Sequence, residues 1–134
     1  MLMHTKLQSR SKVILVAILG FTVLASLAFL MPSTKLPSVR INGPLAIDKI
    51  VHAGIHFVLV LGWLLYANSK AKLNFSLFLI IITSCVGYGI LIEVLQYITK
   101  TRGAELADIY ANLVGTGLGT SLYLVYKAYL YIKY

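Results

Sequence analysis

Acidic residues are scarce in this sequence. Among 134 residues there are 4 Asp and Glu against 12 Lys and Arg, so that 12% of the chain is charged. Soluble domains carry about a quarter of charged residues, and so low a share excludes a water-soluble globular protein. Because acids are so few, the position of each one is informative.

Cysteine is nearly absent as well, since Cys85 stands alone inside an apolar run. One cysteine forms neither an intramolecular disulfide nor a cysteine-pair zinc motif, which excludes disulfide frameworks and zinc fingers. The net charge of +8 is typical of nucleic-acid-binding proteins, but here the basic residues fall in short groups between apolar segments. We therefore expect no nucleic-acid partner.

Long apolar segments dominate the chain, whose mean hydropathy is +0.86. A helix needs about 20 residues to cross ~30 Å of hydrocarbon. Segments of about this length lie at residues 13–31, 50–67, 75–98 and 106–126. We predict an all-α integral membrane bundle of four transmembrane helices, forming a single domain over residues 1–134, with membrane lipids as partners.

The first segment follows Lys6, Arg10 and Lys12, a pattern that also describes a secretory signal peptide. Its unbroken apolar run from Val13 to Met31 is long for a signal sequence and favours a retained helix, with cleavage as the alternative. Lys and Arg number seven at the termini and in the second loop, against five in the first and third loops. The positive-inside rule then places both termini in the cytoplasm.

Polar residues recur at helical spacing in the last three segments, at the end predicted to face outward. Residues three, four or seven positions apart share one face of a helix. The three stripes are Asp48, His52 and His56; Glu93, Gln96 and Lys100; and Glu105, Asp108 and Asn112. We expect them to meet in a polar pocket between the helices.

Glu93 is the strongest functional candidate among the acids. Near a helix C-terminus its charge opposes the helix dipole, and a charge at the centre of a membrane helix costs ~2.5–3.5 kcal/mol on insertion scales. Unless it is protonated, Glu93 needs a partner or a water-filled cavity. Asp48 and Glu105 have a simpler explanation as groups that cap helix N-termini. Asp108 has the same explanation, but its stripe continues inward through Asn112.

Small residues at Ala111, Gly115 and Gly119 form a small-xxx-small pattern that lets a neighbouring backbone approach closely. Gly87 and Gly89 are predicted to do the same in the preceding segment. These residues are expected to be structural, and their close packing would bring the polar stripes together.

Two blocks of residues resemble the VanZ-like family of small bacterial multi-helix membrane proteins. The first block is Asp48-Lys49-x-x-His52, and the second combines Glu93-x-x-Gln96 with Arg102-x-x-Glu105-x-x-Asp108-x-x-x-Asn112-x-x-Gly115. The resemblance covers residues 48–119 and implies a location in the bacterial cytoplasmic membrane. The family is named for a protein associated with resistance to the glycopeptide teicoplanin, so the resemblance also implies a link to that resistance. The implied binding residues are Asp48, Lys49, His52, Glu93, Gln96, Arg102, Asp108 and Asn112.

His56 departs from the family's pattern. A His-x-x-x-His pair on one helical face suits a metal ion, but paired interior histidines more often satisfy hydrogen bonds. The sequence therefore predicts no metal and no cofactor.

Four functions remain open. In the first, the pocket binds a lipid headgroup or a lipid-linked cell-wall precursor, and the Arg102 guanidinium bonds to its phosphate or carboxylate. Alternatively it is the active site of a membrane enzyme, with Glu93, His52 and Asp108 as acid–base candidates. The third is a small transporter of protons or solutes, which the apolar inner halves of the helices disfavour. The fourth is a purely structural membrane subunit, and the oligomeric state is not determined by the sequence.

Overall fold

The computed structural model describes residues 2–31, 47–70, 73–101, 103 and 105–133, with side chains from Arg10 onward in the first range. These residues form α1 (Leu2–Leu30), α2 (Ile47–Ser69), α3 (Phe75–Thr99) and α4 (Leu106–Lys133), and no strand occurs among them. The predicted all-α fold is confirmed. Each helix extends beyond its predicted apolar segment at one end or both.

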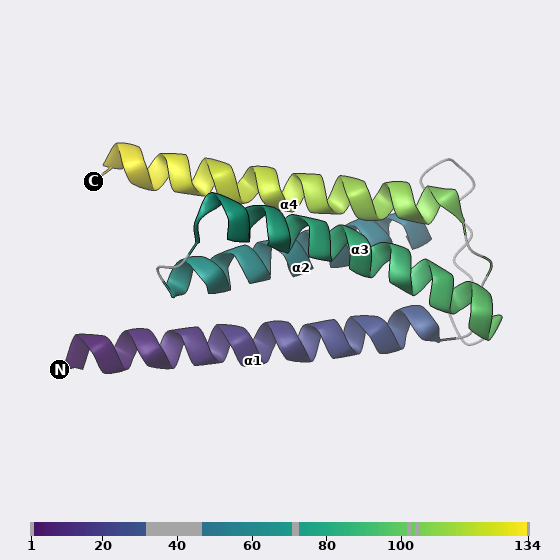
Figure 1. Cartoon of the computed structure of the whole chain (residues 1–134), viewed down its shortest axis with the longest axis horizontal. Helices are drawn as coiled ribbons and strands as arrows, with labels where there is room; N and C mark the ends of the chain where they lie inside the picture. The colour runs from purple at the N-terminus through teal and green to yellow at the C-terminus, as the bar shows by residue number, and fades with distance from the viewer. Residues whose placement is uncertain (1, 32–46, 71–72, 102, 104, 134) are drawn as a thin grey trace.

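Consecutive helices run in opposite directions, so both termini lie at the same end of the bundle (Figure 1). The start of α2, the end of α3 and the start of α4 meet at the opposite end, which we call the polar end. The three predicted polar stripes are therefore brought to one place.

The helices are those of a multi-pass membrane protein. By length and composition, Arg10–Leu30 of α1, Ile47–Ser69 of α2 and Phe75–Thr99 of α3 are able to cross a membrane. Helix α4 is less clearly a span than predicted, because its polar residues, glycines and tyrosines lower its hydropathy. Three of the polar residues form a buried row: Asp108, Asn112 and Thr116. Large apolar side chains such as Val16, Ile80 and Leu118 are exposed on the outside of the bundle, as expected for a lipid-facing surface.

Helix α3 has a defined boundary at each end. The Asn74 side chain accepts a hydrogen bond from the Leu77 backbone N–H at 2.8 Å, which caps the first turn. At the other end Lys100 adopts a left-handed conformation with φ of 52° and stops the helix. Glu93 and Gln96 thereby lie within the last two turns of α3, where Glu93 faces the starts of α2 and α4.

Helices α2 and α4 pack backbone to backbone at two glycines. A Cβ atom placed on Gly115 would lie 2.0 Å from the Ala53 carbonyl oxygen, and one on Gly119 would lie 2.7 Å from the Phe57 carbonyl oxygen. The predicted small-residue contact is confirmed at both positions. Only glycine permits this approach, because backbone atoms have no rotamer by which to move aside.

The prediction for the α3 glycines is half right. A Cβ on Gly89 would lie 2.8 Å from His56 Cε1 and 2.9 Å from Asn112 Nδ2, so Gly89 makes room for two polar side chains. Gly87 faces open space, with nothing within 4 Å of such an atom. Its role as a packing residue is therefore wrong, because it lies on the other side of α3.

Two clusters of buried apolar side chains hold the helices together. One core cluster joins α2, α3 and α4 and consists of Val60, Leu64, Ala67, Ile81, Cys85 and Tyr123. A second cluster attaches α1 through Ala25 and Phe29, which pack with Ile92. The Ser26 and Tyr88 hydroxyls, 2.9 Å apart, add a polar contact between α1 and α3.

We expect Gly115→Ala to destabilise the protein by about 1–3 kcal/mol, the usual cost of overpacking, because the added methyl meets the Ala53 backbone. The thermal unfolding midpoint in detergent micelles measures the effect. Gly117→Ala is the matched control, since a Cβ there has nothing within 4 Å. Equal midpoints for the two variants would contradict the close approach of α2 and α4.

Candidate functional site

Lys49 lies among acidic side chains at the polar end. Its Nζ is 2.6 Å from Glu105 Oε2 and 3.4 Å from Asp48 Oδ2, and it also contacts Asp108 Oδ1. We call these four residues the Lys49 cluster. The side chains of Lys49 and Asp108 are 18% and 6% exposed, so this ion pair lies largely out of water. The cluster ties the first turn of α2 to the first turn of α4.

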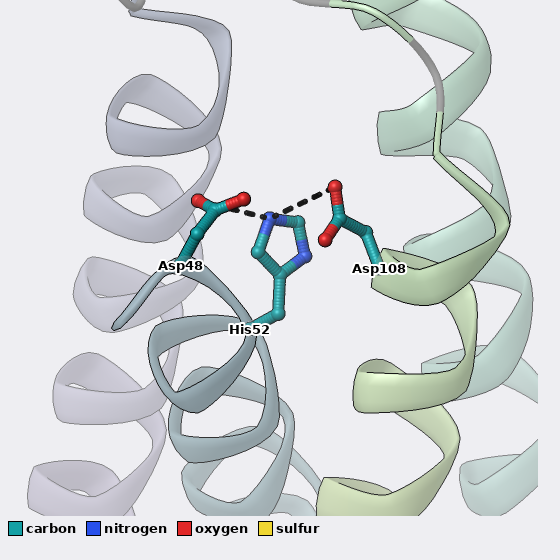
Figure 2. Close-up of side chains that lie close together, drawn as sticks. All are labelled: Asp48, His52 and Asp108. Carbon is teal, nitrogen blue, oxygen red and sulfur yellow. Dashed lines mark ion pairs between the residues drawn. The ribbon is translucent and has the colours of Figure 1, made fainter. Parts of the chain in front are cut away.

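His52 lies one turn below Asp48 on α2 and is completely buried. Its Nδ1 is 3.2 Å from Asn112 Oδ1 on α4. Because an amide oxygen only accepts hydrogen bonds, Nδ1 carries the proton in this contact. The other ring nitrogen, Nε2, lies 4.0 Å from Asp48 Oδ1 and 4.0 Å from Asp108 Oδ2, between the two carboxylates (Figure 2).

Glu93 is 2% exposed and lies between α3 and the start of α4. Its Oε2 accepts a hydrogen bond from the Glu105 backbone N–H at 3.4 Å, just before α4 begins. Its Oε1 is 3.8 Å from His52 Nδ1 and has no hydrogen-bond partner among the described residues. The carboxylate that had no capping explanation in its own helix thus meets the N-terminus of the next one.

Gln96 turns away from the Lys49 cluster. It is 1% exposed, and its Nε2 donates a hydrogen bond to the Phe29 carbonyl oxygen in the last turn of α1 at 2.7 Å. A buried amide that satisfies a helix-terminal carbonyl stabilises the docking of that helix. The structure therefore directs Gln96 to α1 rather than to the pocket that was expected to contain it.

A second polar layer lies one turn deeper. His56 is completely buried, its Nδ1 lies 3.5 Å from Thr116 Oγ1, and its ring centroid is 5.8 Å from that of Tyr88. Thr116 was missed in the sequence, although it continues the Asp108–Asn112 row at the next four-residue step. A threonine in a membrane helix usually satisfies its own backbone, so the spacing alone was a weak signal.

Six of the eight implied binding residues come together in this way: Asp48, Lys49, His52, Glu93, Asp108 and Asn112. Gln96 faces α1, and Arg102 lies outside the described residues. The interaction of Arg102 with an anionic group therefore stays a prediction. No carboxylate is paired with His56 in the described part of the chain, so the two histidines have different surroundings.

An apolar groove of about 550 Å³ begins at the Lys49 cluster and follows α2 and α4 away from the polar end. Its walls are Lys49, Ile50, Ala53, Gly54, Phe57, Ala107, Tyr110, Ala111, Val114 and Leu118. The spacing of residues in the sequence does not predict this groove, because a groove depends on how the two helices pack. The site is therefore amphipathic, with an ionic end and an apolar channel.

The sequence was also compared with known proteins. A family model described as VanZ/LLP1 matches residues 3–127, nearly the whole chain. Neither the curated proteins nor the solved structures contain a match. The match thus extends well beyond residues 48–119, on which the resemblance was first recognised.

We expect Lys49→Met to destabilise the protein by about 3 kcal/mol, at the low end for a buried ion pair, because it leaves Asp108 unpaired in a largely dry site. Unfolding in detergent by heat or denaturant measures the loss. Adding Asp108→Asn to Lys49→Met should restore part of the stability, since the unpaired charge is then removed.

Lys127→Met is the control for this experiment. The Lys127 ammonium contacts Asn68 Oδ1 at 3.1 Å in an exposed position, so its loss should change stability by no more than about 0.5 kcal/mol. If Lys49→Met were as stable as Lys127→Met, the Lys49 cluster would have no structural role.

Proposed function

The chain belongs to the VanZ/LLP1 family, and from this membership and the geometry of the polar end we propose that it binds an amphiphile of the bacterial cell envelope. In this proposal the protein lies in the cytoplasmic membrane with both termini in the cytoplasm. The headgroup, from a lipid or a lipid-linked cell-wall precursor, lies at the Lys49 cluster on the outer side. The acyl chain lies in the groove between α2 and α4.

The observation that supports this function best is the continuity of the groove with the cluster. Lys49 belongs to both, since its ammonium contacts the carboxylates while its side chain forms part of the groove wall. From there the groove wall extends along α2 to Phe57 and along α4 to Leu118. At ~1.5 Å per residue this is a length of about 12–16 Å, enough for about ten methylenes of an acyl chain.

The charges of the cluster indicate which headgroups suit it. Three carboxylates, those of Asp48, Glu105 and Asp108, contact the Lys49 ammonium, and a fourth, that of Glu93, accepts a hydrogen bond from the Glu105 backbone N–H. Carboxylates only accept hydrogen bonds, so they favour a headgroup that offers donors, such as an ammonium group or the hydroxyls and amides of a sugar. Glu105, whose side chain is 61% exposed, and Asp48, at 40%, are the most accessible of these acceptors.

Gly54→Leu tests the groove. The glycine lies in the groove wall, and a Cβ there has nothing within 4 Å, so the new side chain fills the groove without disturbing the fold. Displacing two methylenes of a bound chain would cost roughly 1.6 kcal/mol, or about ten-fold in affinity. Native mass spectrometry of the detergent-solubilised protein with added phosphatidylethanolamine measures the bound fraction.

Gly87→Leu is the matched control, because Gly87 also faces open space but lies on α3, away from this groove. It should bind phosphatidylethanolamine as the wild-type protein does. Equal binding by the Gly54→Leu variant, with an unchanged unfolding midpoint, would exclude the groove as the lipid site. Equal weakening in both variants would show that lipid binds the bundle non-specifically.

We extend the proposal to teicoplanin resistance, to which the family resemblance points. Expression of the chain in a susceptible bacterium should raise the inhibitory concentration of teicoplanin, and Gly54→Leu should abolish the rise while Gly87→Leu retains it. Membrane levels of the three proteins are compared by immunoblot. No rise with a well-expressed wild-type protein would separate this chain from the resistance phenotype.

A further inference from the structure

We propose that Asp48, His52 and Asp108 bind a divalent transition-metal ion at the polar end. One ligand atom from each of these residues lies within 4.8 Å of the others. The sequence predicted no metal, because it considered the pair His52 and His56 rather than a histidine between two carboxylates from different helices. The inference does not depend on the binding of an amphiphile.

The hydrogen bonding of His52 leaves one nitrogen aimed at the carboxylates. Nδ1 donates to Asn112 Oδ1 at 3.2 Å, which fixes the tautomer in which Nε2 has a lone pair. Nε2 is buried in a residue with no exposed surface and has no hydrogen-bond partner in the described part of the chain. A metal-binding histidine has this same arrangement, with the second ring N–H held by an oxygen acceptor.

Each carboxylate divides its two oxygens between different neighbours. Asp108 turns Oδ1 to Lys49 and Oδ2 to His52, and Asp48 turns Oδ2 to Lys49 and Oδ1 to His52 (Figure 2). The ammonium therefore lies on one side of the two acids and His52 Nε2 on the other. The three atoms that face one another on the His52 side are two carboxylate oxygens and an imidazole nitrogen, which are metal ligands by type.

The distances suit an ion between these atoms better than a direct hydrogen bond. Nε2 is 4.0 Å from each oxygen, whereas a hydrogen bond between N and O is about 2.7–3.2 Å long. Around a tetrahedral metal ion with bonds of about 2.0–2.2 Å, neighbouring ligand atoms lie about 3.3–3.6 Å apart, so each of these contacts has to close by about half an ångström. Asp48, with 40% of its side chain exposed, has room to close the remaining separation.

The ligand set indicates the kind of ion. Imidazole nitrogen with carboxylate oxygen suits zinc or manganese, whereas calcium and magnesium prefer oxygen alone. Three protein ligands leave a coordination position open on a zinc ion, as in catalytic rather than structural sites. This position would lie beside Asp48, on the accessible side of the cluster, and would take water or an anionic oxygen.

The test is metal binding by the full-length protein in detergent, stripped with a chelator and dialysed against Zn²⁺ or Mn²⁺. We expect about one ion per chain by elemental analysis and a higher unfolding midpoint when the ion is present. His52→Asn and Asp48→Asn should each weaken binding by at least about ten-fold. The Asp48 side chain is 40% exposed, so Asp48→Asn is the variant least prone to unfold.

His56→Asn is the matched control, since His56 is on the same helix, equally buried and without a carboxylate partner among the described residues. It should bind the ion as the wild-type protein does. Failure of the folded wild-type protein to retain either ion would overturn the proposal and leave His52 as a structural residue that bonds Asn112. Equal loss in His56→Asn and His52→Asn would overturn it in favour of the two histidines.

Discussion

The buried carboxylate of Asp108 requires a cation close to it, and the Lys49 ammonium meets this requirement. It contacts Asp48, Glu105 and Asp108, and it does so from the first turn of α2, where a long side chain reaches α4. Without this contact Asp108, at 6% exposure, would be an unpaired charge in a nearly dry site. The other polar contacts at the polar end surround the ion pair between Lys49 and Asp108.

The pair itself depends on how closely α2 and α4 approach. Gly115 and Gly119 allow the α4 backbone to touch the carbonyls of Ala53 and Phe57. At this separation the side chains one or two turns above the contact meet across the interface, and His52 reaches Asn112. The same approach forms the walls of the apolar groove that begins at Lys49. Small residues near the middle of the helices thus determine the geometry of a site at their ends.

Much of the candidate site was predictable because helical spacing is a local property. Asp48 and His52 are four residues apart, as are Asp108 and Asn112, and both pairs were assigned to a shared face. Spacing did not reveal that Gln96 would bond to the Phe29 carbonyl oxygen, since that contact joins α3 to α1. Gly87 was misassigned for a related reason, because its side of α3 is fixed by the packing of that helix on its neighbours.

The sequence by itself determined the class of protein and the content of the polar end. Apolar length requires helices in a membrane, and four acids at the ends of three helices must lie together if the helices alternate in direction. Only the tertiary structure decided the pairing, because which oxygen faces the Lys49 ammonium and which faces His52 depends on the rotation and separation of α2 and α4. Those quantities follow from side-chain packing across the interface, to which residues far apart in the chain contribute.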